Sequence, residues 1–326
     1  MDSLKFSITV PAYKARFFKE CIESVLAQTY SNFELIIVND DSPEDLDGIV
    51  SSFDDPRIRY YKNDKGFGGY YLVKNWNKCL DYCTGDYMIC MGDDDKLLPC
   101  CLEEYVKLIK QIPGLNVYHA WTQIIDSKSN VVTMTPDRGL LESCYSIMWH
   151  RVQGRRQFIG DYLFSVRNLR EMGGFYFLPY AWGSDDITVW RAAEKGGIAN
   201  GQVPMFQFRI SGLQISNTPH SEDKMKAVDL RYRWMCEFLE KEPDGEIDKI
   251  YHHDLVNGLL DSDLKNHQCD LIERDLRAFG NNRLDYWMEH REEYRIDHSL
   301  LNSFRNSLRS QKVIRRLKRI KHLFHK

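Results

Sequence analysis

Three consecutive aspartates, Asp93, Asp94 and Asp95, are the residues of this 326-residue chain with the clearest capacity for chemistry. They follow the apolar run Tyr87–Met91, which is short enough to be one buried strand and which ends at Gly92. Adjacent carboxylates repel each other and raise each other's pKa, so a hard divalent cation is the natural way to neutralise them. The triplet therefore predicts a metal site, the alternative being a solvated acidic turn.

The segments before the triplet predict a doubly wound α/β unit. Two β-rich runs, Phe6–Val10 and Phe33–Val38, flank a stretch with apolar residues at helical spacing, Phe18–Leu26. The second run is continuously apolar, as expected of a parallel strand covered on both faces. Ile58–Lys62 adds a third strand and Trp76–Tyr82 a helix before the strand that leads to the triplet.

Ligands of such sheets bind beyond the carboxyl ends of the strands, which selects three clusters. An aromatic side chain after the first strand can cover a base, and a carboxylate after the second can accept from an imide N–H or a ribose hydroxyl. A metal-binding carboxylate can bridge to a diphosphate, so the three clusters together suit a nucleoside diphosphate. The candidate nucleotide-binding residues are Pro11, Ala12, Tyr13, Asp40, Asp41, Lys74, Asn75, Asp93 and Asp94.

Two common nucleotide motifs are missing from the sequence. No G-x-x-x-x-G-K-[ST] motif is present, which excludes a P-loop NTPase, and no G-x-G-x-x-G follows the first strand, so a dinucleotide site is unsupported. Gly66–Gly69 is rich in glycine but is typical of a loop.

Four motifs, in order and at matching spacing, resemble family 2 glycosyltransferases of the GT-A fold. They are Ser7–Tyr13, Phe33–Ser42, Thr84–Ile89 and Gly92–Pro99, and the likeness extends over roughly residues 5–215. The resemblance implies a nucleotide-sugar donor, usually a UDP-sugar, a Mg²⁺ or Mn²⁺ ion held by a D-x-D motif, and inversion at the anomeric carbon.

The chain departs from the family pattern at the triplet. Aligned on Pro99, the family's usual Asp-Ser-Asp-Asp places its first aspartate where this chain has Gly92. The resemblance therefore leaves the register open among Asp93, Asp94 and Asp95. We expect Asp94 or Asp95 to bind the ion and Asp93 to contact the donor's ribose or sugar.

An inverting transfer also needs a base on the acceptor side, because the acceptor hydroxyl must lose a proton. Asp185 and Asp186 precede a helix-like segment, Ile187–Gly196, that is similar to the family's Glu-Asp pair and the helix it opens. Counting back from Arg191 places Asp185 on the base position, with Asp186 as the alternative. Ser184 stands in place of the family's glutamate, and a simple helix N-cap remains a competing interpretation of Asp185.

Flanking segments support that alignment. Gly160–Arg167 and Glu171–Phe175 resemble the family's acceptor-side strand and Gly-Gly-Phe turn, and Phe208–Ser216 resembles its closing segment. Many relatives carry a histidine near the position of Ser211, so a third metal ligand is in doubt; His220 is a weak substitute.

Residues 216–304 are predicted to be a helical region that packs on a catalytic domain of residues 1–215, itself divided into a nucleotide-binding half, 1–98, and an acceptor-side half, 99–215. One apolar stripe runs from Met225 to Leu239 and another contains Ile247, Tyr251, Leu255 and Leu259. Arg233-Trp234 is similar to part of the Q-x-x-R-W motif of processive synthases, but Leu230 replaces the glutamine.

The last segment, residues 305–326, predicts a basic amphipathic helix. It holds nine of the 44 basic residues and no acid, so the preceding residues carry 35 basic against 47 acidic groups. Val313, Leu317, Ile320 and Phe324 form one apolar stripe, which favours an anionic membrane surface as partner over docking on the protein or a nucleic-acid arm.

The composition is that of a cytoplasmic enzyme. Nine cysteines without a C-x-x-C pair fit a reducing compartment, and no leader or 18-residue apolar run is expected. Together the features predict a transferase at the inner face of the cell membrane. It would add one hexosyl or N-acetylhexosaminyl unit to a lipid-linked or other surface glycan such as capsule, O-antigen or exopolysaccharide. The alternatives are a nucleotidylyltransferase and a sugar-nucleotide-binding protein without turnover.

Overall fold

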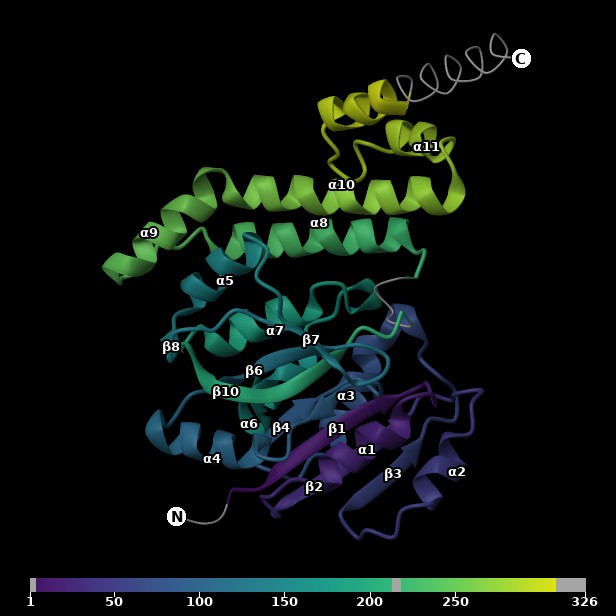
Figure 1. Ribbon diagram of the computed structural model, residues 1–326. Coiled ribbons are helices and arrows are strands. Elements are labelled where there is room, and N and C mark those ends of the chain that lie inside the picture. The colour runs from purple at the N-terminus through teal and green to yellow at the C-terminus, as the bar shows by residue number, and fades with distance from the viewer. Residues whose placement is uncertain (1–3, 213–217, 309–326) are drawn as a thin grey trace, which may run out of the picture.

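The computed structural model describes residues 4–212 and 218–308 of the chain. Its centre is one mixed sheet with the strand order β3-β2-β1-β4-β9-β6-β10-β5, with β7 beside β6 and β8 beside β10 (Figure 1). The strands are β1 (Phe6–Ala12), β2 (Phe33–Asn39), β3 (Ile58–Lys62), β4 (Tyr87–Cys90), β5 (Lys96–Leu97), β6 (Val117–Ile125), β7 (Val131–Met134), β8 (Leu141–Glu142), β9 (Tyr162–Ser165) and β10 (Ile198–Arg209).

The first four long strands confirm the predicted doubly wound unit. Strands β1, β2, β3 and β4 are mutually parallel, whereas β9 runs antiparallel between β4 and β6. The helices of this part are α1 (Phe18–Leu26), α2 (Leu46–Ser51), α3 (Leu72–Tyr82), α4 (Cys101–Gln111), α5 (Cys144–Val152), α6 (Val166–Glu171) and α7 (Ser184–Ala193), with short 3-10 helices η1 (Gly69–Tyr71), η2 (Ile159–Asp161) and η3 (Pro179–Ala181).

Strand β2 shows why the sheet is covered on both faces. All seven of its residues are buried. Leu35 and Ile37 contribute to the core under α1, α2 and α4, whereas Ile36 and Val38 contribute to the core under α3 and α7. Alternation along an extended chain sends neighbouring side chains to opposite faces, so a continuous apolar run supplies two cores at once.

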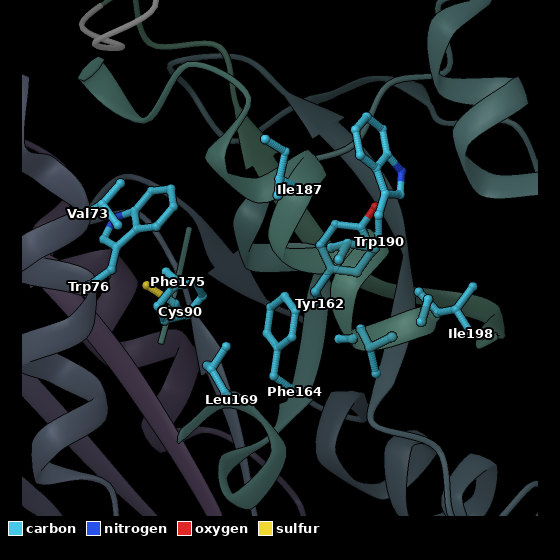
Figure 2. Close-up of a cluster of buried hydrophobic side chains, with 14 of the residues drawn as sticks. Val73, Trp76, Cys90, Tyr162, Phe164, Leu169, Phe175, Ile187, Trp190 and Ile198 are labelled. Carbon is cyan, nitrogen blue, oxygen red and sulfur yellow. The ribbon is translucent and has the colours of Figure 1, made fainter. Parts of the chain in front are cut away.

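The second of these cores fixes helix α7 against the sheet (Figure 2). Ile187 and Trp190 of α7 are fully buried. In β9, Tyr162 is also fully buried and the exposed fraction of Phe164 is 1%. Trp190 is one of the largest buried side chains of the molecule. Because close-packed interiors resist displacement, this cluster sets the position of the aspartates at the start of α7.

Helices follow the sheet: α8 (Ser221–Phe238), α9 (Glu246–Asp254), a π-helical segment (Leu255–Leu259), α10 (Leu260–Phe279) and α11 (Arg283–Glu289), with helix again over residues 298–308. Figure 1 shows α8 and α10 side by side on the far side of α5 and α7 from the sheet. Asp244-Gly245 lies between α8 and α9, and Gly280–Asn282 lies between α10 and α11.

The two predicted apolar stripes differ in outcome. Met225, Val228 and Met235 of α8 are buried, which confirms the first stripe. The second was wrong at Ile247, whose side chain is 69% exposed. Helix α9 contacts α5 through polar pairs, in which Ser143 donates to Asp248 and the Trp149 indole donates to Asp254, while Ile247 faces solvent.

Two further observations concern the length of the helices and the state of the cysteines. No helix within the described ranges is both long and apolar enough to span a bilayer. All nine cysteines are free thiols, and most are buried. The predicted tail helix of residues 305–326 lies outside the described residues from 309 onward.

Candidate active site

Three parallel strands end side by side and place the predicted donor residues at one edge. Ala12 pairs with Asn39, and Thr9 with Cys90, so the carboxyl ends of β1, β2 and β4 lie together. A cavity of about 690 Å³ opens at this edge, a volume typical of small-molecule sites. Its walls include Pro11, Tyr13, Asp40, Asn75, all three aspartates of the triplet, Asp185 and Asp186.

Asp93 is directed toward the end of β1. Its Oδ2 accepts hydrogen bonds from the backbone N–H groups of Tyr13 and Lys14, both at 2.7 Å. Burial outweighs these bonds and raises the pKa of Asp93 to about 6. Asp93 therefore links the segment after β1, which carries the candidate base-covering Tyr13, to the segment after β4, which carries the triplet.

Asp95 is held from the other side of the cavity by Arg209, the last residue of β10. The Arg209 backbone N–H donates to Asp95 Oδ1 at 2.9 Å, and its guanidinium donates to the carbonyl of Asp94 at 2.7 Å. That guanidinium is fully buried and also pairs with Glu20 at 2.9 Å. Burial and the neighbouring Asp94 raise the pKa of Asp95 well above its ordinary value.

Gly92 leaves a space into which two carboxylates of the triplet point. A Cβ on residue 92 would lie 3.0 Å from Asp95 Oδ2 and 3.1 Å from Asp94 Oδ1. The other oxygen of Asp94 accepts from the Ser211 hydroxyl at 2.8 Å. Two carboxylate oxygens that converge on a space beside a glycine fit a hard cation with oxygen ligands.

The described residues do not surround such a cation on their own. No group of three or more His, Cys, Asp or Glu side chains within them is arranged to hold a metal. An ion here would therefore take part of its coordination from solvent or from the phosphates of a ligand, as Mg²⁺ commonly does.

Asp40 is bound by the glycine-rich loop. Its Oδ1 accepts from the backbone N–H of Phe67 and from Asn63 Nδ2, both at 2.9 Å, and its Oδ2 accepts from the N–H of Gly68 at 3.1 Å. Asn63 also donates to Asn75 Oδ1 at 3.1 Å. Residues 66–68 are a loop, as predicted, and they fix the Asp40 carboxylate at the cavity wall.

Three predicted donor residues lie outside the cavity wall. Ala12 is buried, and its carbonyl accepts from the Asp40 N–H at 3.0 Å. Asp41 is exposed and has a positive φ of 56°. Lys74 is exposed on α3, with its ammonium 4.2 Å from the centre of the Tyr71 ring. Their part in binding a donor stays a prediction.

Asp186 is enclosed by cationic and amide donors. Its Oδ1 accepts from Arg151 at 2.7 Å and from Gln157 at 2.6 Å, and its Oδ2 accepts from Arg231 at 2.8 Å. Burial acts to raise the pKa of Asp186, but the two guanidinium groups outweigh it and hold that pKa below its ordinary value. A carboxylate bonded in this way is a poor proton acceptor.

Asp185, one residue before Asp186, lies in an environment without such donors in the described part of the chain. Among residues 4–212 and 218–308, no side chain donates a hydrogen bond to its carboxylate, which faces the cavity. Burial, and then the charge of Asp186, raise the pKa of Asp185 to about 7. A base with a pKa near neutrality is suited to general-base chemistry. The Asp185 side chain does not act as the N-cap, because that position belongs to Gly183.

Sequence reasoning missed most residues that hold these carboxylates. Arg151 and Gln157 carry no motif that marks them. Arg231, which also pairs with Asp263 at 2.6 Å, lies two residues before the Arg233-Trp234 pair that resembled a synthase motif. Arg209 lies in the segment aligned with the family's closing segment, but its buried role was not foreseen.

The two candidates for a third metal ligand lie apart. Ser211 contacts the triplet through Asp94. His220 lines the cavity but stacks on Tyr180, with ring centres 4.3 Å apart. As a metal ligand, His220 stays a prediction.

Sequence comparison gives a family for the part of the chain that builds this site. Residues 7–164 match the model described as glycosyl transferase family 2. An uncharacterised glycosyltransferase of Rickettsia typhi is 32% identical over 128 residues, which is 38% of this chain and 38% of that protein. The putative glycosyltransferase EpsE of Bacillus subtilis is 26% identical over 205 residues, covering 59% of this chain and 68% of EpsE.

Structural comparison extends the likeness to the helices after the sheet. Residues 1–349 of TarS from S. aureus, solved in complex with UDP-GlcNAc, align over 93% of this chain and 92% of that chain, with a TM-score of 0.62 and 16% identity. At that identity the likeness shows a shared fold, which is the GT-A architecture expected from the motifs. Residues 7–164, just under half of the chain, are similar to glycosyl transferase family 2.

Proposed function

We propose that the protein is an inverting, metal-dependent glycosyltransferase that transfers one sugar from a UDP-sugar to a hydroxyl of a growing glycan. The observation that carries the proposal is the pair of unlike acidic groups in one cavity. Asp93, Asp94 and Asp95 line it on the side of the strand ends, and Asp185 lines it on the side of α7. A UDP-GlcNAc complex of the structurally similar TarS supports a donor of this chemical class.

In the proposed reaction Asp185 accepts the proton of the acceptor hydroxyl. The acceptor oxygen forms a bond to the anomeric carbon while the bond from that carbon to the diphosphate oxygen breaks, and UDP leaves. A single displacement inverts the anomeric configuration. Asp186 is a positioning residue, because Arg151 and Arg231 bind both of its oxygens and thereby fix the start of α7.

The leaving diphosphate needs a counter-charge. Asp94 and Asp95 would hold Mg²⁺ or Mn²⁺ at the space beside Gly92, and the ion would stabilise charge on the leaving oxygens. On the donor side, Asp40 and Tyr13 would contact the uracil base or the ribose, and Asp93 would contact the ribose or the sugar. A hexosyl or N-acetylhexosaminyl donor is proposed from the family resemblance.

The direct test is a panel of UDP-, GDP- and dTDP-sugars assayed for slow hydrolysis with and without Mn²⁺. The proposal expects one UDP-sugar to be hydrolysed, with activity lost in EDTA and restored by Mn²⁺ or Mg²⁺. Nucleotide binding without any turnover across the panel would instead support a binding protein. Pyrophosphate-dependent formation of a nucleotide sugar would support a nucleotidylyltransferase.

The proposed pathway and location rest on the tail, 305–326, and on the family. We place the enzyme at the inner face of the cell membrane, with a catalytic domain of residues 1–215 and a helical region of 216–304. A lipid-linked surface glycan would then be the acceptor. Removing residues 309–326 should abolish co-sedimentation with anionic liposomes and leave UDP-sugar hydrolysis in solution intact. Equal sedimentation of both proteins would contradict membrane binding by the tail.

A further inference from the structure

An aromatic cluster at the mouth of the cavity has no part in the chemistry above. Helices η1 and η3 meet there, one from each half of the sheet. The ring of Tyr70 lies 4.7 Å from that of Tyr71, 6.2 Å from Phe177 and 5.7 Å from Tyr180, measured between ring centres. Tyr71 and Phe177 also stack, at 5.7 Å and 23°. With His220 we call these five rings the aromatic platform.

The aromatic platform runs from the cavity to solvent. Tyr180 and His220 stack on each other and line the same cavity as Asp185. Tyr71 and Phe177 are 42% and 41% exposed. Large aromatic rings in contact with each other yet open to water are favourable surface for a ligand with an apolar face.

The backbone that presents Tyr180 is strained. Tyr180 and Ala181 both have a left-handed conformation, with φ of 56° and 53°. Consecutive non-glycine residues in this region are costly, and such strain is concentrated at ligand-binding and catalytic sites. Here it directs the Tyr180 ring toward Tyr70 and His220.

The charges beside the aromatic platform are balanced. The Lys74 ammonium lies over Tyr71. Asp223 lies close enough to Tyr180 that, after burial, it helps to raise the pKa of that phenol. One cation and one anion at opposite ends favour a neutral ligand over a polyanion. A pyranose ring has a face of C–H groups for an aromatic ring and hydroxyls for the tyrosine O–H groups.

We propose that the aromatic platform is an acceptor subsite that binds a pyranose ring of an uncharged glycan, next to the sugar whose hydroxyl meets Asp185. The inference rests on the proposed function, because it takes the Asp185 side of the cavity as the acceptor side. It deepens that function, since the preferred acceptor then has at least two sugar rings.

The test compares short acceptors in a double variant, Tyr71→Ala with Phe177→Ala, whose two side chains are exposed in the folded protein. Methyl glycosides of glucose, galactose and N-acetylglucosamine and their disaccharides are offered with the donor found in the hydrolysis panel. For wild type we expect the best disaccharide to have a KM about tenfold below its monosaccharide, equivalent to about 1.4 kcal/mol. The double variant should lose that advantage while its Kd for UDP is unchanged.

A matched control is Phe279→Ala, which removes a 52% exposed ring from α10 and should change neither constant. The subsite is refuted if the double variant keeps the disaccharide advantage, or if its UDP affinity falls, which would place the nucleotide on the rings. Should wild type hydrolyse no nucleotide sugar, the proposed function fails separately. Saturation-transfer NMR with the same disaccharides then decides the subsite: binding weakened in the double variant supports it, and no binding to wild type overturns it.

Discussion

The cavity holds two aspartate clusters, the triplet Asp93–Asp95 and the pair Asp185–Asp186. The two clusters differ in the groups that bind their carboxylates. Within the described residues no lysine or arginine forms a salt bridge with a carboxylate of Asp93, Asp94 or Asp95; backbone N–H groups and a serine hydroxyl bind them. At α7, by contrast, Arg151 and Arg231 both pair with Asp186.

Arginine salt bridges are present at α7 and absent at the triplet among the described residues, which suggests different roles for the two clusters. Burial raises the pKa of Asp93 and Asp95, and an external cation would favour the charged form of these carboxylates, so the triplet fits a metal. At α7 the protein supplies its own cations to one carboxylate and leaves its neighbour as the group that can exchange a proton. Each cluster is expected to fail in its own way when it is altered.

The largest expected effect is loss of turnover in Asp185→Asn. The amide keeps the size of the side chain but cannot accept a proton, so turnover should fall by about 10² to 10⁴. UDP affinity, measured by calorimetry with Mn²⁺, should be retained. Near-normal turnover would remove Asp185 from the mechanism.

The same substitution one residue later, Asp186→Asn, should act chiefly on stability. It removes the carboxylate partner of the partly buried Arg151 and one of the two carboxylate partners of the buried Arg231, and breaking a buried ion pair from one side costs about 3 to 5 kcal/mol. The free energy of unfolding in urea should fall by an amount of that order, with Asp185→Asn as the matched control that does not destabilise. If both variants unfold at the same urea concentration, the two aspartates do not differ as described.

A smaller effect is expected at the triplet. Asp94→Ala should remove the increase in UDP affinity that Mn²⁺ produces, whereas UDP binding without metal should change little. A loss of about 10- to 100-fold in metal affinity is typical of altered metal sites. Asp47→Ala, which changes an exposed aspartate on α2, is the control. Full metal dependence in Asp94→Ala and in Asp95→Ala would show that the ion binds elsewhere.

Gly92→Ala tests the position of the proposed metal ion by adding a single methyl group. Its Cβ would lie 3.0 and 3.1 Å from the carboxylate oxygens of Asp95 and Asp94. These side chains can shift by a few tenths of an ångström, so the fold should survive. Metal-dependent UDP affinity should fall several-fold, by less than in Asp94→Ala. An unchanged affinity would mean that the ion does not occupy the space beside Gly92.

The sequence predicted the strands and the acidic clusters because both depend on local patterns. The run Phe33–Val38 has to be a strand with two buried faces, and Asp40 and Asp93 follow strands whose ends adjoin in any parallel sheet. The partners of the carboxylates come from distant elements. Arg231 reaches Asp186 across 45 residues and Arg209 reaches Asp95 across 114, and no local pattern encodes such contacts.

The division of labour between Asp185 and Asp186 belongs to that second kind of information. Both aspartates lie in the first turn of α7, where a carboxylate is favourable beside the helix N-terminus. Spacing placed the base on Asp185 through the family alignment. The physical reason is that three side chains already donate hydrogen bonds to Asp186. These donors come from α5, from the loop that contains Gln157 and from α8, which only the fold brings together.

The smallest predicted effect is a pH-dependent difference in stability between wild type and Asp185→Asn. The folded-state pKa of Asp185 is raised from an ordinary value of 3.8 to about 7. The native state therefore holds a proton that the unfolded chain has lost, and wild-type stability declines as pH rises from about 4 to about 7.

The variant has no such proton. Asp185→Asn should match wild type in thermal stability near pH 4.5 and exceed it at pH 8, by on the order of 1 kcal/mol, because partial exposure screens the charge. Subtracting one titration from the other cancels the contributions of buried carboxylates that do not interact with Asp185. If wild type instead gained stability relative to the variant above pH 7, Asp185 would be a favourably paired carboxylate like Asp186, and the contrast between the two would be lost.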